Sequence, residues 1–375
     1  MTNGSLDPAG LVDFDPMQRA LDLAQAIPGR VSPNPAVGAV VVRDCTIVGE
    51  GWTQPPGGQH AEVVALQAAG EAARGAQLYV TLEPCAHQGR TPPCTEAILA
   101  AGLSSVVCAM EDPDPRVNGM GLGRLRSAGV EVLSGSHEAE ARDLLADYVK
   151  HRLTGLPLVT AKFVCSLDGK IAAHSGDSRW VSGPETLAWA HQERTHLDSI
   201  AVGSNTIVVD DPQLTARPGG VEEGAHQPLR VVIDTRGRVP ASARVLRGPA
   251  RTMIATTRCS SEAWCAEMKR QGAEVVIFPE SDGHVALRPL LELLAQRGCL
   301  NLLVEGGGIL LGSFFDAGLI DRVRAIIAPL IIGGATAPTA VAGRGVERMA
   351  DAWRLGEVKV RMLGNDVLVQ GLVPN

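Results

Sequence analysis

The stretch that decides the fold of the amino-terminal half is His60-Ala61-Glu62, followed by Glu83-Pro84-Cys85 and, after eight intervening residues, by Cys94. One imidazole and two thiolates suit Zn²⁺, and three protein ligands leave its fourth tetrahedral position open for water. Zinc lowers the pKa of such a water to about 7, which supplies a nucleophile at neutral pH. We therefore predict a catalytic zinc site with His60, Cys85 and Cys94 as its ligands.

Glu62 lies two residues after His60, on the first turn of a predicted helix. There its carboxylate can face the open side of the metal site and transfer protons without being a ligand. An H-x-E motif with a P-C motif is typical of zinc-dependent base deaminases, although their two cysteines are usually two residues apart. The alternatives are two buried free thiols, or a closed structural zinc site, for which His87 is the nearby candidate for a fourth ligand.

Strand and helix patterns alternate through the first 154 residues, which predicts a layered α/β domain. Predicted strands are 37–42, 47–52, 78–82, 106–110 and 130–133, and predicted helices are 17–26, 60–70, 94–101, 122–128 and 138–154. Gly155-Leu156-Pro157 then breaks the last helix. We predict a flexible tail over 1–15, a first domain over 16–154 and a second domain over 156–375.

The second half is predicted to be another α/β domain, with strands at 158–165, 199–202, 230–233, 252–255, 274–278, 300–304 and 323–328. Its glycine triplet, Gly306 to Gly308, separates a strand from an apolar helical stretch, and such turns let backbone N–H groups approach a phosphate. The triplet is not a G-x-G-x-x-G fingerprint, so a Rossmann domain is not indicated. Lys162 lies within an apolar strand, where its charge needs a partner.

Composition excludes several classes of function. The net charge of −7 argues against non-specific binding of nucleic acids. Apolar runs are too short to span a bilayer, and the acidic amino terminus lacks the order of a secretion signal. The eight cysteines form no dense framework. We expect reduced thiols and a cytoplasmic protein that binds neither nucleic acid nor membrane.

The motifs together resemble the bifunctional deaminase–reductase family of riboflavin biosynthesis. The resemblance begins with Pro33-Asn34-Pro35 and Val37-Gly38, and is most specific in the spacer Gly89-Arg90-Thr91-Pro92-Pro93 before Cys94. In the second half it rests on residues 162, 166–172, 178–182, 210–217, 232–235, 329 and 333–334. It implies a cytidine-deaminase-like three-layer domain followed by a dihydrofolate-reductase-like α/β domain.

The resemblance also implies the reactions. Zinc-dependent deamination of 2,5-diamino-6-(5-phosphoribosylamino)pyrimidin-4-one to the uracil precedes NADPH-dependent reduction of the ribosyl group to ribityl, in a homo-oligomer with one Zn²⁺ per chain. The implied catalytic residues are Glu62, Lys162, Asp210 and Glu305. The implied cofactor contacts are Val164, Trp180, Thr206, Asp210, Thr235, Gly306, Gly307 and Gly308. The implied substrate contacts are Asn34, Ser178, Arg194, Leu214, Arg217 and Glu305.

Two positions depart from the family pattern, because Ser32 and Thr53 stand where many members have His. Three other interpretations remain open: a deaminase of free nucleosides or tRNA bases, a structural zinc beside an active reductase, and a regulatory protein on a silenced enzyme fold. Arg258, after a predicted strand, is a candidate for holding the 2′-phosphate of NADPH.

Overall fold

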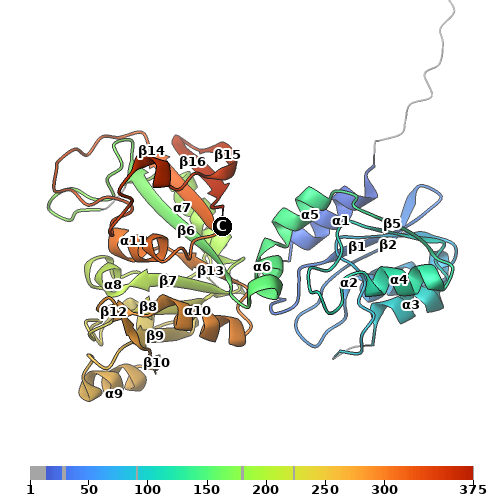
Figure 1. Cartoon of the computed structure of the whole chain (residues 1–375), viewed down its shortest axis with the longest axis horizontal. Coiled ribbons are helices and arrows are strands. Elements are labelled where there is room, and N and C mark those ends of the chain that lie inside the picture. The colour runs from blue at the N-terminus through green and yellow to red at the C-terminus, as the bar shows by residue number, and fades with distance from the viewer. Residues whose placement is uncertain (1–13, 28–30, 90–91, 179–180, 223, 375) are drawn as a thin grey trace, which may run out of the picture. The chain divides into compact units, whose positions relative to one another are not determined.

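The structure, a computed structural model, describes residues 14–27, 31–89, 92–178, 181–222 and 224–374. These residues form two compact units, which we call the amino-terminal unit (14–27 with 34–149) and the carboxy-terminal unit (31–33 with 150–374). Each contains a sheet packed against helices (Figure 1). Within the described ranges, no helix is long and apolar enough to cross a membrane.

The amino-terminal unit contains, in its described part, a five-stranded sheet of order β2-β1-β3-β4-β5. Strand β1 pairs antiparallel with β2 and β3, whereas β3, β4 and β5 are parallel. The strands are β1 (Gly38–Arg43), β2 (Thr46–Trp52), β3 (Gln77–Val80), β4 (Ser105–Cys108) and β5 (Glu131–Ser134). The helices are α1 (Pro16–Gln25), α2 (Ala61–Ala69), the short η1 (Gly70–Ala73), α3 (Cys94–Ala101), α4 (Met120–Ser127) and α5 (Glu138–Leu144).

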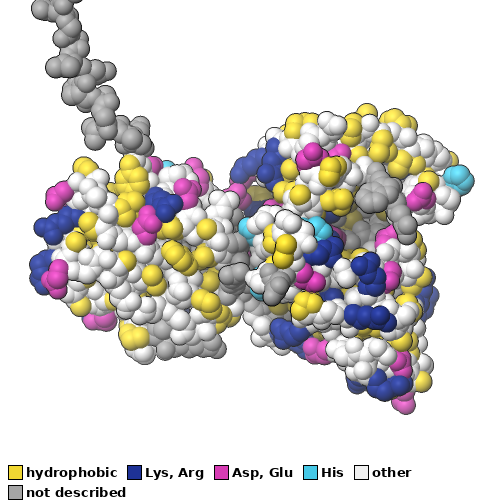
Figure 2. Space-filling view, turned by 180° about the vertical axis from the view of Figure 1, so that it is seen from behind, with side chains coloured by type: hydrophobic (Ala, Val, Ile, Leu, Met, Phe, Trp, Pro, Cys, Tyr) yellow, Lys and Arg dark blue, Asp and Glu magenta, His cyan; other side chains and the backbone are white. Residues whose placement is uncertain are grey.

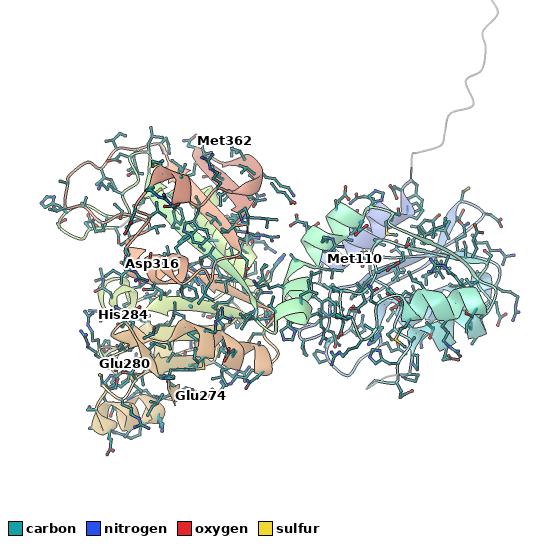
Figure 3. All side chains as sticks on the ribbon, in the orientation of Figure 1. Met110, Glu274, Glu280, His284, Asp316 and Met362 are labelled. Carbon is teal, nitrogen blue, oxygen red and sulfur yellow. The ribbon has the colours of Figure 1, made fainter. Side chains whose placement is uncertain are left out.

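Two glycines show how closely helices cover both faces of this sheet. A Cβ atom on Gly38 would lie 1.9 Å from the carbonyl oxygen of Ala20 in α1. A Cβ atom on Gly51, which points to the other face, would lie 2.3 Å from the carbonyl oxygen of Ala61 in α2. Met110, which is labelled in Figure 3, is among the buried residues of this unit. The three-layer arrangement expected from the sequence is therefore present.

One predicted helix is wrong. The segment 138–154 forms two helices, α5 and α6 (Ala146–Thr154), instead of one. They meet at Leu145, whose φ of −96° and ψ of 16° lie in the sparsely populated bridge region. The Leu145 side chain is buried. We attribute the break to the packing of this side chain, which overrides the helical periodicity of the segment.

The carboxy-terminal unit contains, where it is described, a nine-stranded sheet of order β10-β9-β8-β7-β13-β6-β14-β16-β15. The strands from β10 to β14 in this order run parallel, and β16 and β15 add antiparallel pairs at one edge. Its strands are β6 (Leu158–Ser166), β7 (Ser199–Gly203), β8 (Leu229–Ile233), β9 (Thr252–Thr256), β10 (Glu274–Ile277), β13 (Asn301–Val304), β14 (Arg322–Ala328), β15 (Gly356–Leu363) and β16 (Asp366–Leu372). A separate small hairpin is formed by β11 (Glu280–Ser281) and β12 (His284–Val285).

Helices and apolar clusters cover both faces of the parallel strands. The helices are α7 (Pro184–Arg194), α8 (Ser204–Asp210), α9 (Glu262–Arg270), α10 (Leu287–Gln296) and α11 (Gly308–Asp316), with short turns η2 (Pro218–Gly220), η3 (Arg244–Leu246) and η4 (Met349–Asp351). One cluster contains Ala201 and Val231, and the other contains their neighbours Val202 and Val232. Because successive strand residues point to opposite faces, the two clusters lie on opposite sides of the sheet.

Candidate zinc and reductase sites

The predicted zinc ligands come together in the amino-terminal unit. His60 immediately precedes α2, Cys94 is the first residue of α3, and Cys85 lies in the loop after β3. The ligand atoms of the three side chains all lie within 4.8 Å of one another. His60 Nδ1 is 3.2 Å from Cys94 Sγ and 3.6 Å from Cys85 Sγ. Tetrahedral zinc requires N···S separations of about 3.5 Å, so the three side chains fit this metal.

The electrostatics of the cluster favour a thiolate. The hydrogen bond from the Cys94 thiol lowers the pKa of Cys85 to about 4, and the Cys94 backbone N–H, 3.3 Å from Cys85 Sγ, adds to the effect. The same hydrogen bond raises the pKa of Cys94, whose proton is shared with Cys85. A stable thiolate is what a zinc ligand requires.

Glu62 lies beside this cluster in the first turn of α2 and is only 4% exposed. Burial raises its pKa to about 7, and the neighbouring Cys85 thiolate adds to the shift. A carboxyl group with a pKa near neutrality can both accept and return a proton, which suits general acid–base chemistry. The side chain of His87 is exposed, and the candidate metal-binding group found among the described residues consists of His60, Cys85 and Cys94 without it.

Glu83, quoted in the motif but given no role, supports the site. Its carboxylate accepts four backbone hydrogen bonds, from Asp112 (3.0 Å), Gly119 (2.9 Å), Gly121 (2.8 Å) and Leu122 (3.2 Å). In the sequence, the signal that could have identified this role is the position of an acidic residue between an apolar strand and a metal ligand. Because Glu83 precedes Pro84-Cys85 directly, these bonds join the ligand loop to the segment from Asp112 to Leu122.

Thr53, one of the two departures from the family pattern, has a structural role. Its Oγ1 accepts a 3.0 Å hydrogen bond from the Val37 N–H, and its own N–H donates to the Val37 carbonyl at 2.9 Å. The contact fixes the end of the segment that carries Asn34, which is half-buried. A hydroxyl group can therefore hold this segment where other members have an imidazole.

A second cluster forms in the carboxy-terminal unit, around Glu305. This residue follows β13, whose last residue pairs with Ala161 of β6, so Glu305 lies beside Lys162. Glu305 Oε1 is 3.8 Å from Lys162 Nζ, and Oε2 is 2.7 Å from Arg194 Nη2, at the end of α7. All three side chains are nearly buried, at 11–13% exposed. Sequence positions 162, 194 and 305 thus meet in one place.

The charges in this cluster depend on one another. Burial alone would raise the pKa of Glu305, but the positive charges of Arg194 and Lys162 outweigh burial and lower it to about 2. Burial lowers the pKa of Lys162, against the opposing charge of Glu305. Within the described residues, Arg194 Nε is buried and has no hydrogen-bond partner. The cluster therefore offers a cationic surface with an unused donor, suited to an anionic ligand.

Arg217 and Leu214 lie next to this cluster, on the segment after α8. Leu214 is buried and has a φ of +57°, a conformation that non-glycine residues rarely adopt. Arg217 is half-buried and contacts His191 of α7, a residue that the sequence analysis did not select. His191 is three residues before Arg194 on the same helix, so helical periodicity places both on one face.

The residues predicted to bind the cofactor lie near the carboxyl ends of neighbouring strands, where α/β sheets bind ligands. Val164 is near the end of β6, Thr206 is in α8 after β7, Thr235 follows β8, and Gly306 to Gly308 follow β13. Trp180 lies outside the described residues.

The glycine turn leaves room for a ligand. A Cβ atom on Gly307, the N-cap of α11, would have only Thr206 Oγ1 near it, at 3.9 Å. On Gly308 the same atom would lie 2.3 Å from the Thr339 carbonyl oxygen. Gly308 is therefore required by packing, whereas Gly307 leaves open space at a helix start, a position where backbone N–H groups can bind an anion.

Asp210 and Ser178 form a separate pair. Ser178 Oγ donates a 3.0 Å hydrogen bond to Asp210 Oδ1 at the exposed end of α8. The hydrogen bonds and ion pairs of the described residues link Asp210 to Ser178 and do not link it to Lys162 or Glu305. The structure thus gathers two of the three residues predicted to act on the sugar, Lys162 and Glu305, whereas the third, Asp210, lies at the end of α8.

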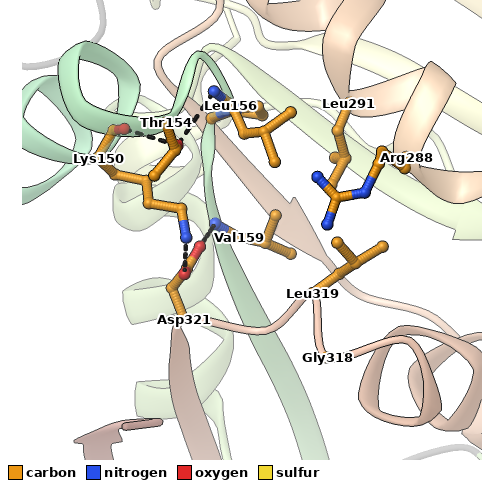
Figure 4. A pocket seen from close by; sticks show the side chains of 10 residues that line it. Lys150, Thr154, Leu156, Val159, Arg288, Leu291, Gly318, Leu319 and Asp321 are labelled. Atoms are coloured by element: carbon orange, nitrogen blue, oxygen red, sulfur yellow. Dashed lines mark hydrogen bonds and ion pairs between the residues drawn. The ribbon is translucent and has the colours of Figure 1, made fainter. Parts of the chain in front are cut away.

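A cavity of about 290 Å³ lies elsewhere in the carboxy-terminal unit, beside the start of β6, where Leu156 and Val159 line it (Figure 4). Lys150 Nζ contacts Asp321 Oδ1 at 2.6 Å along its wall. Because Lys162 and Glu305 lie further along the strands, this cavity is at the opposite end of the sheet from the candidate reductase site. On the face shown in Figure 2, basic and acidic side chains of this unit are interspersed.

Two family models match the chain. The RibD C-terminal domain matches residues 157–369, and the cytidine and deoxycytidylate deaminase zinc-binding region matches residues 13–110. The riboflavin biosynthesis protein RibD of Escherichia coli strain K12 is 39% identical over 365 residues, which cover 94% of this chain and 96% of the relative. RibD of Aquifex aeolicus is 39% identical over 358 residues, 96% of this chain and 98% of the relative.

Solved structures agree in fold over nearly the whole length. Acinetobacter baumannii RibD superimposes with a TM-score of 0.85 at 36% identity and covers 96% of this chain and 98% of its own. A diaminohydroxyphosphoribosylaminopyrimidine deaminase/5-amino-6-(5-phosphoribosylamino)uracil reductase from Thermotoga maritima gives 0.83 at 33% identity, with the same coverage of both chains.

Proposed function

The chain belongs to the RibD family and is a bifunctional deaminase and reductase of riboflavin biosynthesis, and on this premise we propose its substrates and the roles of its residues. The first site deaminates 2,5-diamino-6-(5-phosphoribosylamino)pyrimidin-4-one to the corresponding uracil. The second site uses NADPH to reduce the ribosyl group of that uracil to ribityl. The observation that carries the proposal is that each unit gathers its own set of reactive side chains: His60, Cys85, Cys94 and Glu62 in one, Lys162, Arg194 and Glu305 in the other.

In the deaminase, His60, Cys85 and Cys94 hold the metal, which supplies the nucleophile by acidifying a water. Glu62 would take one proton of that water and deliver it to a ring nitrogen, and would then pass the second proton to the departing amine, which leaves as ammonia. Its pKa of about 7 allows the carboxyl group to lose and regain a proton readily at neutral pH. Asn34, at the end of the segment held by Thr53, contacts the pyrimidine.

In the reductase, Lys162 and Glu305 face the sugar carbon that accepts hydride, and Asp210 contacts both sugar and cofactor. Arg194, Arg217, Ser178 and Leu214 hold the phosphorylated substrate. The buried Arg194 Nε without a partner supports this role, because an orphaned buried donor is costly unless a ligand pairs with it. Lys162 keeps a polarisable N–H group near the sugar oxygen, and Glu305 balances its charge.

The nicotinamide cofactor supplies the hydride, and the protein orients it. Thr206, Thr235, Val164 and the Gly306–Gly308 turn line the strand ends where it would lie, with Gly307 open toward its phosphates. NADPH is the proposed form of the cofactor. Trp180, outside the described residues, remains an expected contact.

The proposed enzyme is cytoplasmic and homo-oligomeric. The described cysteines are all free, which is typical of a reducing compartment. Strand β15 is an edge of its sheet and exposes Val358, Val360 and Met362 on one side. Such an apolar edge is suited to pairing with a second copy, and light scattering on the purified protein would measure the oligomeric state.

A coupled assay tests the proposed function. Zinc-loaded protein receives the diaminopyrimidinone substrate and NADPH, and both ammonia release and NADPH oxidation are measured. We expect both signals, and we expect Glu62→Gln to lose them while it keeps zinc and still oxidises NADPH when given the deaminated uracil. Ammonia without NADPH oxidation would refute the reductase assignment. Normal ammonia release by Glu62→Gln would show that the zinc is structural, and release from cytidine alone would favour a nucleoside deaminase.

A further inference from the structure

His191 is placed between the two arginines that the proposed function assigns to the substrate. The ring of this half-buried residue contacts two groups: its Nδ1 lies 3.2 Å from the carbonyl oxygen of Thr215, and its Nε2 lies 3.2 Å from Nη2 of Arg217. Arg194, one helical turn later, places its Nη1 3.2 Å from the same Thr215 carbonyl oxygen. The imidazole and the Arg194 guanidinium thus share one backbone carbonyl, and the imidazole links that carbonyl to the Arg217 guanidinium.

These contacts determine which nitrogen of His191 carries the proton. A carbonyl oxygen only accepts hydrogen bonds, so Nδ1 must donate to Thr215. A guanidinium only donates, so Nε2 must be the unprotonated acceptor for Arg217. The imidazole is therefore neutral in this arrangement. The protonated form of His191 could not make both contacts, because both of its ring nitrogens would be donors and neither could accept from Arg217.

Arg217 is held on a second side by its own loop. Its Nη1 donates to Thr215 Oγ1 at 3.0 Å and to the side-chain oxygen of Gln213. Nη2 is held by His191 alone among the hydrogen bonds of the described residues. Without that acceptor, the guanidinium could rotate about its Nη1 contacts. Two-sided support of this kind fixes the plane of a guanidinium, which is what a bidentate bond to a phosphate requires.

We propose that His191 is a positioning residue of the reductase, which in its neutral Nδ1–H form holds Arg217 in the orientation that binds the substrate phosphate. The inference rests on the proposed function, because it deepens the role given there to Arg217. His191 acts through Arg217 and does not itself take part in hydride transfer. Its loss should weaken substrate binding in the ground state and transition state alike, which raises KM and leaves kcat nearly unchanged.

The charges that face His191 predict how KM responds to pH. Arg217 faces it from the loop before η2, Arg194 from its own helix and Glu305 from the end of β13. Burial lowers the pKa of His191, and the two arginines lower it further, against the carbonyl of Thr215 and the charge of Glu305. The neutral form is thus kept at neutral pH. As pH falls through the lowered pKa, the acceptor is lost and KM should rise.

Two amide substitutions separate the two contacts of the ring. Nε2 is three bonds from Cβ, as is the amide oxygen of Gln, whereas Nδ1 is two bonds away, as are the amide atoms of Asn. His191→Gln can therefore accept from Arg217 but cannot reach Thr215, and His191→Asn can do the reverse. A matched control is His196→Asn, because His196 is half-buried near the end of the same helix and contacts Gln192 instead.

The experiment measures steady-state kinetics of NADPH oxidation with the deaminated uracil substrate for the full-length variants. We expect Arg217→Ala and His191→Ala each to raise KM about tenfold with kcat within about twofold, and the double variant to be no worse than Arg217→Ala. His191→Gln should restore a KM within about twofold of the parent and flatten its rise at acid pH, whereas His191→Asn should behave like Ala and His196→Asn like the parent. Comparing parent with His191→Gln cancels the titration of the substrate phosphate, whose second pKa is about 6.

Each other outcome has a definite meaning. If Arg217→Ala leaves KM unchanged, the proposed role of Arg217 is wrong and the inference falls with it. If Arg217→Ala raises KM but His191→Ala does not, the substrate assignment stands and the role of His191 is refuted. Equal rescue by Asn and Gln, or additive losses in the double variant, would show that His191 supports the loop through Thr215 and does not act through Arg217.

Discussion

The two sites of this chain are assembled in different ways. The zinc site uses side chains between residues 60 and 94, and three of its four groups lie at helix starts or directly beside one. The reductase site joins Lys162, Arg194 and Glu305, which meet only because β13 lies between β7 and β6 in the sheet. A site built from local motifs is visible in the sequence. A site built by strand order has to be found in the structure.

Among the variants proposed, Glu305→Gln should separate the reductase activity from the deaminase activity most strongly. The change keeps the shape of the side chain but leaves the buried charges of Lys162 and Arg194 without their anion. We expect NADPH oxidation with the uracil substrate to fall at least about 100-fold, with a loss of about 3 kcal/mol in the free energy of unfolding of the carboxy-terminal unit.

Ammonia release from the diaminopyrimidinone, measured on the same preparation of Glu305→Gln, serves as the internal control. We expect it to stay at the parent rate, since the ion pairs of Glu305 among the described residues are with Lys162 and Arg194, both in the carboxy-terminal unit. A parallel loss of ammonia release would contradict the independence of the two sites.

Glu83→Gln tests the support of the zinc site. One carboxylate oxygen becomes an NH₂ group that faces backbone N–H donors, so about half of its four hydrogen bonds are lost. We expect a loss of about 2–3 kcal/mol in the free energy of unfolding of the amino-terminal unit, measured by urea titration. Glu131→Gln, on the exposed face of β5, is the matched control and should be neutral. Equal stability of the two variants would refute the supporting role.

Gly307→Ala and Gly308→Ala separate cofactor binding from folding. A methyl group at Gly307 meets open space and fills the room proposed for a phosphate, whereas at Gly308 it collides with the Thr339 carbonyl. We expect Gly307→Ala to raise the KM for NADPH about tenfold with an unchanged melting temperature, and Gly308→Ala to lower the melting temperature. An unchanged KM for NADPH in Gly307→Ala would mean that the phosphates do not approach this turn.

The smallest expected effect concerns the choice of cofactor. Arg258 is exposed just after β9, at the same edge of the sheet as Thr235. If it pairs with the 2′-phosphate, Arg258→Ala should reduce the preference for NADPH over NADH by a few-fold, because an exposed charge pair contributes at most about 1 kcal/mol. The ratio of kcat/KM for the two cofactors measures it, and an unchanged ratio would exclude Arg258.

Sequence patterns predicted the fold well where the physics is local. Helix α3 has the predicted bounds, and β1 is a buried run as expected. The break between α5 and α6 was missed because it depends on how Leu145 packs, which periodicity does not contain. Strand β15 was not predicted either, although Val358, Val360 and Met362 alternate with polar residues as in a strand. The local signal was therefore present there, even though the central residues of β15 are exposed on both faces.

The candidate sites show the same division. The zinc ligands and Glu62 follow from spacing and metal chemistry, whereas the meeting of Lys162 with Glu305 follows from the register of β6 and β13. The need of Lys162 for an anion was foreseeable from its apolar strand, but the identity of that anion was not. His191 carried no motif, and only its contacts with Thr215 and Arg217 reveal it.

The contact between Lys150 and Asp321 bears on how this chain can be divided. Lys150 belongs to α6, before the Gly155 break that the sequence suggested as a boundary, yet its ammonium group pairs with an aspartate whose other oxygen accepts from the Val159 N–H at 2.9 Å (Figure 4). If the chain were cut or its gene divided after Gly155, the carboxylate of Asp321, which binds the start of β6, would lose its ion pair with Lys150. A reductase produced on its own should therefore begin before Lys150, so that it keeps the end of α6 from Lys150 to Thr154.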